Sequence, residues 1–169
     1  FHQDKSIILM YILNLNNTLS ENRAGAKAFH LSKMMKSGYP VPEGFVILSN
    51  AFDHFAENKT ELSPAFLNEL ETELKTIGAE KYMVRSSAIG EDGAENSFAG
   101  QLSSFISSSQ KEDIIAHIYS CWKSYDNENV KTYQDKTGKQ LNGMAVVVQT
   151  LIEPDYAGVI FTRNPLNET

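Results

Sequence analysis

Short apolar runs typical of β-strands alternate along this chain with longer runs that have helical spacing. The strand-type runs cover residues 11–15, 45–48, 82–87, 98–106, 144–151 and 157–162. The helical runs, in which apolar side chains recur every three or four residues, cover residues 24–36, 63–75 and 114–122. Because strand and helix patterns are mixed and no internal repeat is present, we expect an α+β fold.

Two connecting segments carry further expectations. Ser49 or Asn50 is expected to cap a short helix over residues 51–57, because small polar side chains accept hydrogen bonds from the first amides of a helix. Residues 88–97 are acidic and contain glycine, which predicts a mobile loop between two strands.

The composition is that of an ordinary globular protein, with 41% hydrophobic and 21% charged residues in 169. A net charge of −6 argues against duplex nucleic acid or an anionic membrane as the main partner, because both bind basic surfaces. No apolar run is long enough to cross a bilayer, and we expect a cytoplasmic protein with Cys121 as a buried thiol. The chain begins with Phe1 instead of Met, so we expect a piece of something longer.

The first candidate for anion binding is Lys27, which follows Gly25 and Ala26 at the start of a predicted helix. Small residues let backbone N–H groups approach an anion, and the helix dipole favours negative charge there. A lysine adds a compact cation suited to a phosphate. The local pattern leaves an alternative open, in which Lys27 is a solvent-exposed side chain on a tight helix entry.

The second candidate is Arg85, at the end of an apolar strand and directly before Ser86 and Ser87. Its guanidinium group offers a fork of donors that fits phosphate oxygens, and either hydroxyl could add a neutral donor. An ion pair between Arg85 and Glu91 or Asp92 is the alternative, and local sequence does not decide between the two.

Other chemistries have weaker support in the sequence. Glu91 and Asp92 could ligate a hard cation, but we interpret them as solvated loop charges. The four histidines show no zinc-ligand spacing with one another or with Cys121, and none stands out as a phosphorylated histidine. No Gly-x-Ser-x-Gly nucleophile motif occurs.

Six segments, in this order and spacing, resemble the amino-terminal nucleotide-binding domain of the pyruvate phosphate dikinase, phosphoenolpyruvate synthase and rifampin phosphotransferase family. They are Ala24-Gly25-Ala26-Lys27-Ala28-Phe29-His30-Leu31, Gly38-Tyr39-Pro40-Val41-Pro42-Glu43-Gly44-Phe45, Val84-Arg85-Ser86-Ser87-Ala88-Ile89-Gly90-Glu91-Asp92, Ser97-Phe98-Ala99-Gly100-Gln101, Val146-Val147-Val148-Gln149 and Gly158-Val159-Ile160-Phe161-Thr162-Arg163-Asn164-Pro165. The resemblance runs from about Tyr11 to the end of the chain, and the block from Val84 to Gln101 is its most specific part.

The resemblance implies an ATP-grasp-like fold that holds ATP between two α+β lobes. The chain would be the amino-terminal, incomplete portion of that domain, with approximate lobes at residues 1–80 and 81–169. By the same resemblance, Lys27 and Arg85 contact the phosphates, and Arg85 is the candidate catalytic residue.

The resemblance also assigns four further nucleotide-binding positions. Gly100 and Ser104 match the strand and loop that close over the nucleotide, and Gln101 lies between them. Gln149 matches a glutamine near the adenine and the hinge between the lobes.

The chain differs from the family pattern in four respects. One is the acidic loop, where Ile89, Gly90, Gly93 and Ala94 stand and a threonine hydroxyl that is usual in the family is missing. Alanines at 26 and 28 stand beside Lys27 where the family usually has glycine or another small residue, and Ser104 replaces a threonine while keeping its hydroxyl. The family's magnesium-binding acidic residue, its Gln-x-Arg-Pro strand and its phosphohistidine domain would all follow Thr169. The resemblance therefore implies ATP and Mg²⁺ as cofactors, with no metal ligand inside this chain.

Two functional hypotheses follow. In the first, the chain is part of an ATP-dependent phosphotransferase that passes a phosphoryl group through a phosphohistidine to a small acceptor. Pyruvate leads by family frequency, a rifamycin or a glucan is possible, and the fragment alone is expected to be inactive. In the second, the chain is a non-catalytic or regulatory nucleotide-binding module.

Overall fold

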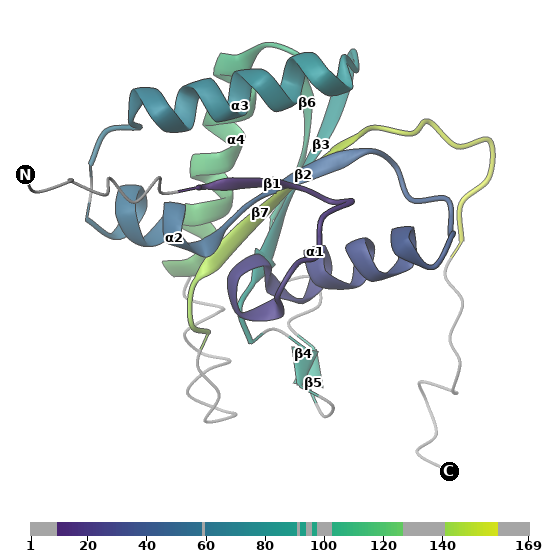
Figure 1. Ribbon diagram of the computed structural model, residues 1–169, viewed down its shortest axis with the longest axis horizontal. Helices are drawn as coiled ribbons and strands as arrows, with labels where there is room; N and C mark the ends of the chain where they lie inside the picture. The colour runs from purple at the N-terminus through teal and green to yellow at the C-terminus, as the bar shows by residue number, and fades with distance from the viewer. Residues whose placement is uncertain are drawn as a thin grey trace, which may run out of the picture.

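The computed structural model describes residues 10–58, 60–90, 92–93, 96–97, 103–126 and 141–158 (Figure 1). The strands of this part are β1 (Ile12–Asn14), β2 (Gly44–Ile47), β3 (Lys81–Ala88), β4 (Asp92–Gly93), β5 (Asn96–Ser97), β6 (Ser104–Ser108) and β7 (Met144–Thr150). The helices are α1 (Glu21–Lys36), α2 (Ser49–Ala51), the π-helix η1 (Phe52–Glu57), α3 (Pro64–Ile77), α4 (Lys111–Lys123) and the 3₁₀ turn η2 (Ser124–Asp126).

Five strands form one antiparallel sheet in the order β1-β2-β7-β3-β6. Helix α1 covers one face of the sheet, whereas α3 and α4 cover the other, as Figure 1 shows. The mixed α/β class is thus confirmed. Strands from before and after residue 80 share this sheet, and the division into lobes at residues 1–80 and 81–169 stays a prediction.

The last strand, β7, lies in the centre of the sheet between β2 and β3. Val146 and Val148 point to the core under α3 and α4, while Val147 points to the smaller core under α1. All three side chains are fully buried. A strand covered on both faces has apolar residues at successive positions, which explains the valine run 146–148.

The α3 side contains the larger core. Aromatic rings dominate it: Tyr11 lies 5.1 Å from Phe55 and 6.0 Å from Phe66 between ring centroids, and Phe55 and Phe66 are 5.3 Å apart. These separations fall in the range of favourable tilted and edge-to-face pairs. The cluster joins the start of β1, the π-helix and α3 into one layer.

The predicted elements are confirmed in type, with two local differences. Helix α1 begins at Glu21, earlier than expected, and is broken at Gly25, where φ is 74° and ψ is 163°. The predicted cap of the 51–57 helix is wrong: Leu48 occupies the N-cap position, no side chain caps the helix, and residues 52–57 form a π-helix. Packing of Phe52 and Phe55 into the core outweighs the local capping preference there.

Several predictions fall partly or wholly outside the described residues. The expected loop at 88–97 contains the short paired strands β4 and β5. Of the strand expected at 157–162, residues 157–158 are described and have no regular structure. No helix in the described ranges has both the length and the apolar character needed to cross a membrane.

Candidate functional site

Arg85 lies on the face of the sheet that α1 covers. Successive side chains of a strand point to opposite faces, and Ser87, two residues further along β3, contacts α1 directly. Arg85 therefore points to the same side, where its side chain is half-buried. It pairs across the strands with Val147 of β7 and Ser104 of β6.

Ser104 is the neighbour of Arg85 on the edge strand. The two residues are directly opposite in the antiparallel register of β3 and β6, and Ser104 is exposed. Directly opposite side chains share one face with Cβ atoms about 4.5–5.5 Å apart. The structure thus brings a guanidinium group and a hydroxyl together at the open end of this face.

Gln149 lies on the other side of Arg85, in β7. It pairs with Met83 and is the diagonal neighbour of Arg85 on the same face. The side chain is 5% exposed, and its Nε2 donates a hydrogen bond to the carbonyl of Pro42 at 3.2 Å. The bond holds the end of β7 against the segment that leads into β2.

Lys27 lies on α1, over this face of the sheet, and is half-buried. Ala24 and Ala28, on either side of it, are both hydrogen-bonded to Ser87 Oγ. Burial raises the pKa of the Cys121 thiol on α4 to about 12, and the Lys27 cation partly opposes that rise. Lys27 is therefore close enough to α4 for its charge to be felt there. The structure therefore places both predicted cations on one side of the sheet, joined through Ser87.

The two hydroxyls after Arg85 have structural partners. Ser86 Oγ donates to the carbonyl of Ser103 at 3.0 Å, and Ser87 Oγ donates to the carbonyl of Ala24 at 2.8 Å. A hydroxyl has one proton to donate, so neither is available to a phosphate in this arrangement. The sequence shows no signal for these two bonds.

The close approach of α1 to β3 depends on Gly25. A Cβ atom at this position would lie 2.2 Å from the Ser87 carbonyl oxygen, and the positive φ also disfavours other residues. The sequence indicated a small-residue helix entry at this point, but not the strand it contacts. Gly25 thus brings the Lys27 segment closer to the sheet than any side chain would allow.

Three predicted contacts lie outside the described residues. They are the two nucleotide contacts of Gly100 and Gln101 and the alternative ion pair of Arg85, because Glu91 and the side chain of Asp92 are not described. Within the described ranges, no group of three or more His, Cys, Asp or Glu side chains is arranged to hold a metal ion.

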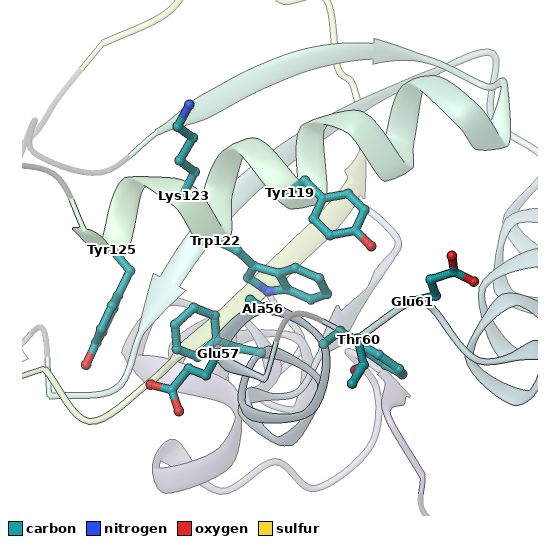
Figure 2. A pocket seen from close by; sticks show the side chains of 10 residues that line it. Ala56, Glu57, Thr60, Glu61, Tyr119, Trp122, Lys123 and Tyr125 are labelled. Carbon is teal, nitrogen blue, oxygen red and sulfur yellow. The ribbon is translucent and has the colours of Figure 1, made fainter.

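A groove of about 470 Å³ lies elsewhere, between η1 and α4 (Figure 2). Its described lining includes Trp122, Tyr119 and Tyr125 from the α4 and η2 side and Glu57 from the π-helix. It opens on the α3 and α4 side of the sheet and contains none of the predicted site residues. The groove is therefore separate from the candidate site.

Comparison with known proteins finds similarity along most of the chain. The family model described as the pyruvate phosphate dikinase, AMP/ATP-binding domain matches residues 58–169. This range contains β3, β6 and β7, the three adjacent strands that carry Arg85, Ser104 and Gln149.

Curated relatives extend the similarity towards the amino terminus. The chain is 37% identical to the uncharacterized phosphotransferase YvkC of Bacillus subtilis, over 87% of this chain and 20% of that protein. It is 28% identical to a probable phosphoenolpyruvate synthase of Methanothermobacter thermautotrophicus, over 84% of this chain and 27% of that protein. It is also 28% identical to a rifampicin phosphotransferase of Streptomyces sviceus, over 93% of this chain and 23% of that protein.

The chain spans about a fifth to a quarter of the length of these relatives. The matched region includes the sheet face that carries Arg85, and the family description names a nucleotide ligand. The chain therefore belongs to the family of the pyruvate phosphate dikinase AMP/ATP-binding domain.

Proposed function

We propose that the α1 side of the sheet binds ATP, with its phosphates between Lys27 and Arg85. The observation that carries this proposal is the shared face of three adjacent strands, on which Arg85 lies between Ser104 and Gln149. Two cations held by secondary structure on one side of a sheet form a fixed anion site even in a chain with a net charge of −6.

Each residue has a role in this proposal. Arg85 donates bidentate hydrogen bonds to phosphate oxygens and is the catalytic group, Lys27 adds a compact charge, and Ser104 donates a neutral hydrogen bond. Gln149 marks the adenine end, where it holds the backbone that reads the base edge. Gly100 and Gln101 complete the segment that closes over the nucleotide, in an ATP-grasp-like domain with lobes near residues 1–80 and 81–169.

In the full protein, this domain would supply the phosphoryl group of an ATP-dependent phosphotransferase. Magnesium, with ligands beyond Thr169, would neutralise charge on the phosphates, and a histidine on another domain would carry the phosphoryl group to the acceptor. Pyruvate is our first choice of acceptor, with a rifamycin or glucan as alternatives, and we place the protein in the cytoplasm. The name of the Methanothermobacter relative supports the first choice and that of the Streptomyces relative the second.

A second candidate function is a nucleotide-binding module without catalysis. Its support is the pair of fully buried alanines, Ala26 and Ala28, which add methyl groups on both sides of Lys27. Turnover separates the two functions, because a module would bind ATP without transferring phosphate to a histidine.

The site is tested by calorimetric titration of ATP and Mg²⁺ into the full-length protein and its Lys27→Ala and Arg85→Ala variants. A charge-assisted hydrogen bond contributes about 1.5–3 kcal/mol, so each variant should bind ATP about 10-fold to 100-fold more weakly. Lys33→Ala is the matched control, because Lys33 is an exposed lysine on the same helix. Unchanged affinity in both site variants would overturn the assignment.

A further inference from the structure

The contact between α1 and β3 contains a hydroxyl that joins two helical segments. Helix α1 is interrupted at Gly25, so residues 21–24 and 26–36 are separate helical pieces. Ser87 Oγ donates to the carbonyl of Ala24 at 2.8 Å, before the break, and accepts from the amide of Ala28 at 3.2 Å, after it. One side chain of β3 therefore fixes the orientation of residues 26–36 relative to residues 21–24.

The surroundings leave this contact little freedom to shift. Ser87 and both of its partners are fully buried. A Cβ atom on Gly25 would lie 2.4 Å from Ser87 Oγ, closer than real Cβ contacts. Removal of the hydroxyl would leave the Ala28 amide without this acceptor in a site that water does not reach.

The contact also joins the two predicted phosphate-binding cations. Arg85 precedes Ser87 by two residues on the same face of β3, and Lys27 directly precedes Ala28. A short segment of β3, the Ser87 hydroxyl and Ala28 of α1 therefore connect Arg85 to Lys27. A shift of about 1 Å between groups that act together on one ligand is enough to weaken their joint effect strongly.

Resting on the proposed function, we infer that Ser87 is a positioning residue that holds Lys27 in register with Arg85 for the phosphates of ATP. Its hydroxyl is fully buried and does not bind the phosphates, because its one proton is donated to the Ala24 carbonyl and phosphate oxygens require a donor. Gly25 has a complementary role, since only a residue without Cβ permits this contact.

The test compares the affinities of the full-length protein for ATP with Mg²⁺ and for adenosine, which lacks phosphates. Ser87→Ala should weaken ATP binding about 10-fold and leave adenosine binding within about twofold. Ser87→Cys, which keeps a weak donor and acceptor, should fall between the wild type and Ser87→Ala. Gly25→Ala should reproduce the selective loss by a different route, because it forces α1 away from the strand.

The matched control is Ser32→Ala. Ser32 is a buried serine of the same helix, and its Oγ donates to the carbonyl of Asn17 at 2.7 Å, away from the break. This variant should lose stability, measured by urea unfolding, without any change in the ratio of the two affinities.

The outcomes separate this inference from the proposed function. In one outcome, Ser87→Ala weakens the binding of ATP and of adenosine equally, or changes the binding of neither, while Lys27→Ala and Arg85→Ala weaken ATP binding. The positioning role is then wrong and the proposed phosphate site stands. If Lys27→Ala and Arg85→Ala leave ATP binding unchanged, the proposed phosphate site and the positioning role are both wrong.

Discussion

At the scale of single residues, burial decides the chemistry of the one cysteine. Cys121 has no exposed surface, and its Sγ lies 3.9 Å from the carbonyl oxygen of Ser103. Burial disfavours the thiolate and raises the pKa to about 12, against 9.0 for an ordinary thiol. The buried structural thiol that the sequence predicted is thus confirmed, and its sulfur has no exposed surface at which a substrate could meet it in the folded chain.

Cys121 should therefore resist alkylation in the native state. Burial raises the pKa of the thiol to about 12, so the protonated form dominates at pH 8, whereas the thiolate is the reactive form. Native protein treated with iodoacetamide at pH 8 should stay unmodified by mass spectrometry under conditions that label the urea-unfolded chain fully. Equal labelling rates in the two states would contradict the burial of this residue.

The same shift predicts how stability changes with pH. Because the folded pKa lies above that of the unfolded chain, Cys121 has no effect on stability below about pH 9 and destabilises the fold as pH rises from 9 to 12. Burial also raises the pKa values of Tyr11, Tyr82 and Tyr119, which act in the same direction. Urea unfolding should show constant stability from pH 7 to about 9 and a loss from there to pH 11 that is smaller in Cys121→Ala. A profile that stays flat above pH 9 would refute this prediction.

At the scale of elements, helix α3 closes an edge of the sheet through one carboxylate. Glu69 Oε2 accepts hydrogen bonds from the backbone amides of Tyr11 and Ile12, both at 2.9 Å. These amides lie at the start of β1, the edge strand beside β2. Ser63 caps the same helix, with its Oγ accepting a hydrogen bond from the Phe66 amide. The helix and the edge strand thus support one another.

Glu69→Ala should destabilise the protein by about 2 kcal/mol, because two charge-assisted hydrogen bonds are lost at a partly buried edge. Glu69→Gln retains an acceptor and should cost about half as much. Both values come from urea unfolding monitored by circular dichroism. Glu73→Ala, one turn further along α3, removes a bond to the Asn14 side chain and should cost about 0.5 kcal/mol. Similar losses in Glu69→Ala and Glu73→Ala would contradict the special role of Glu69.

At the scale of the whole molecule, the sheet is covered unevenly. Its centre lies between α1 on one face and α4 on the other, whereas the α1 face becomes more exposed towards β6, where Ile106 is 62% exposed. The candidate site lies at this transition from covered to open sheet, with Arg85 half-buried and Ser104 exposed. A site at such a margin combines rigid support with access for a ligand.

Hydrogen exchange should follow this uneven cover. The amides of β7 lie between two neighbouring strands and should exchange only through global unfolding of the 169-residue chain. The edge strand β6 pairs with β3 on one side, and its outward amides should exchange about 100-fold faster. Exchange measured by mass spectrometry on peptic fragments would refute this arrangement if β6 were as protected as β7.

Sequence patterns alone determined most of the element types and the two candidate cations. Apolar spacing reflects local geometry, so β3, β7, α3 and α4 were predicted from neighbouring residues. Lys27 and Arg85 were identified because a small-residue helix entry and a strand end are also local features. The cap of the 51–57 helix was predicted wrongly, because burial of aromatic rings there depends on distant partners.

Only the tertiary structure decided which of these residues meet. The insertion of β7 between β2 and β3 places Gln149 beside Arg85, and the pairing of β6 with β3 adds Ser104. The two hydrogen bonds of Ser87 Oγ, to Ala24 before the Gly25 break and to Ala28 after it, join residues about sixty positions apart in the sequence. Such contacts depend on strand order and register, which arise from the packing of the whole core, so no local pattern specifies them.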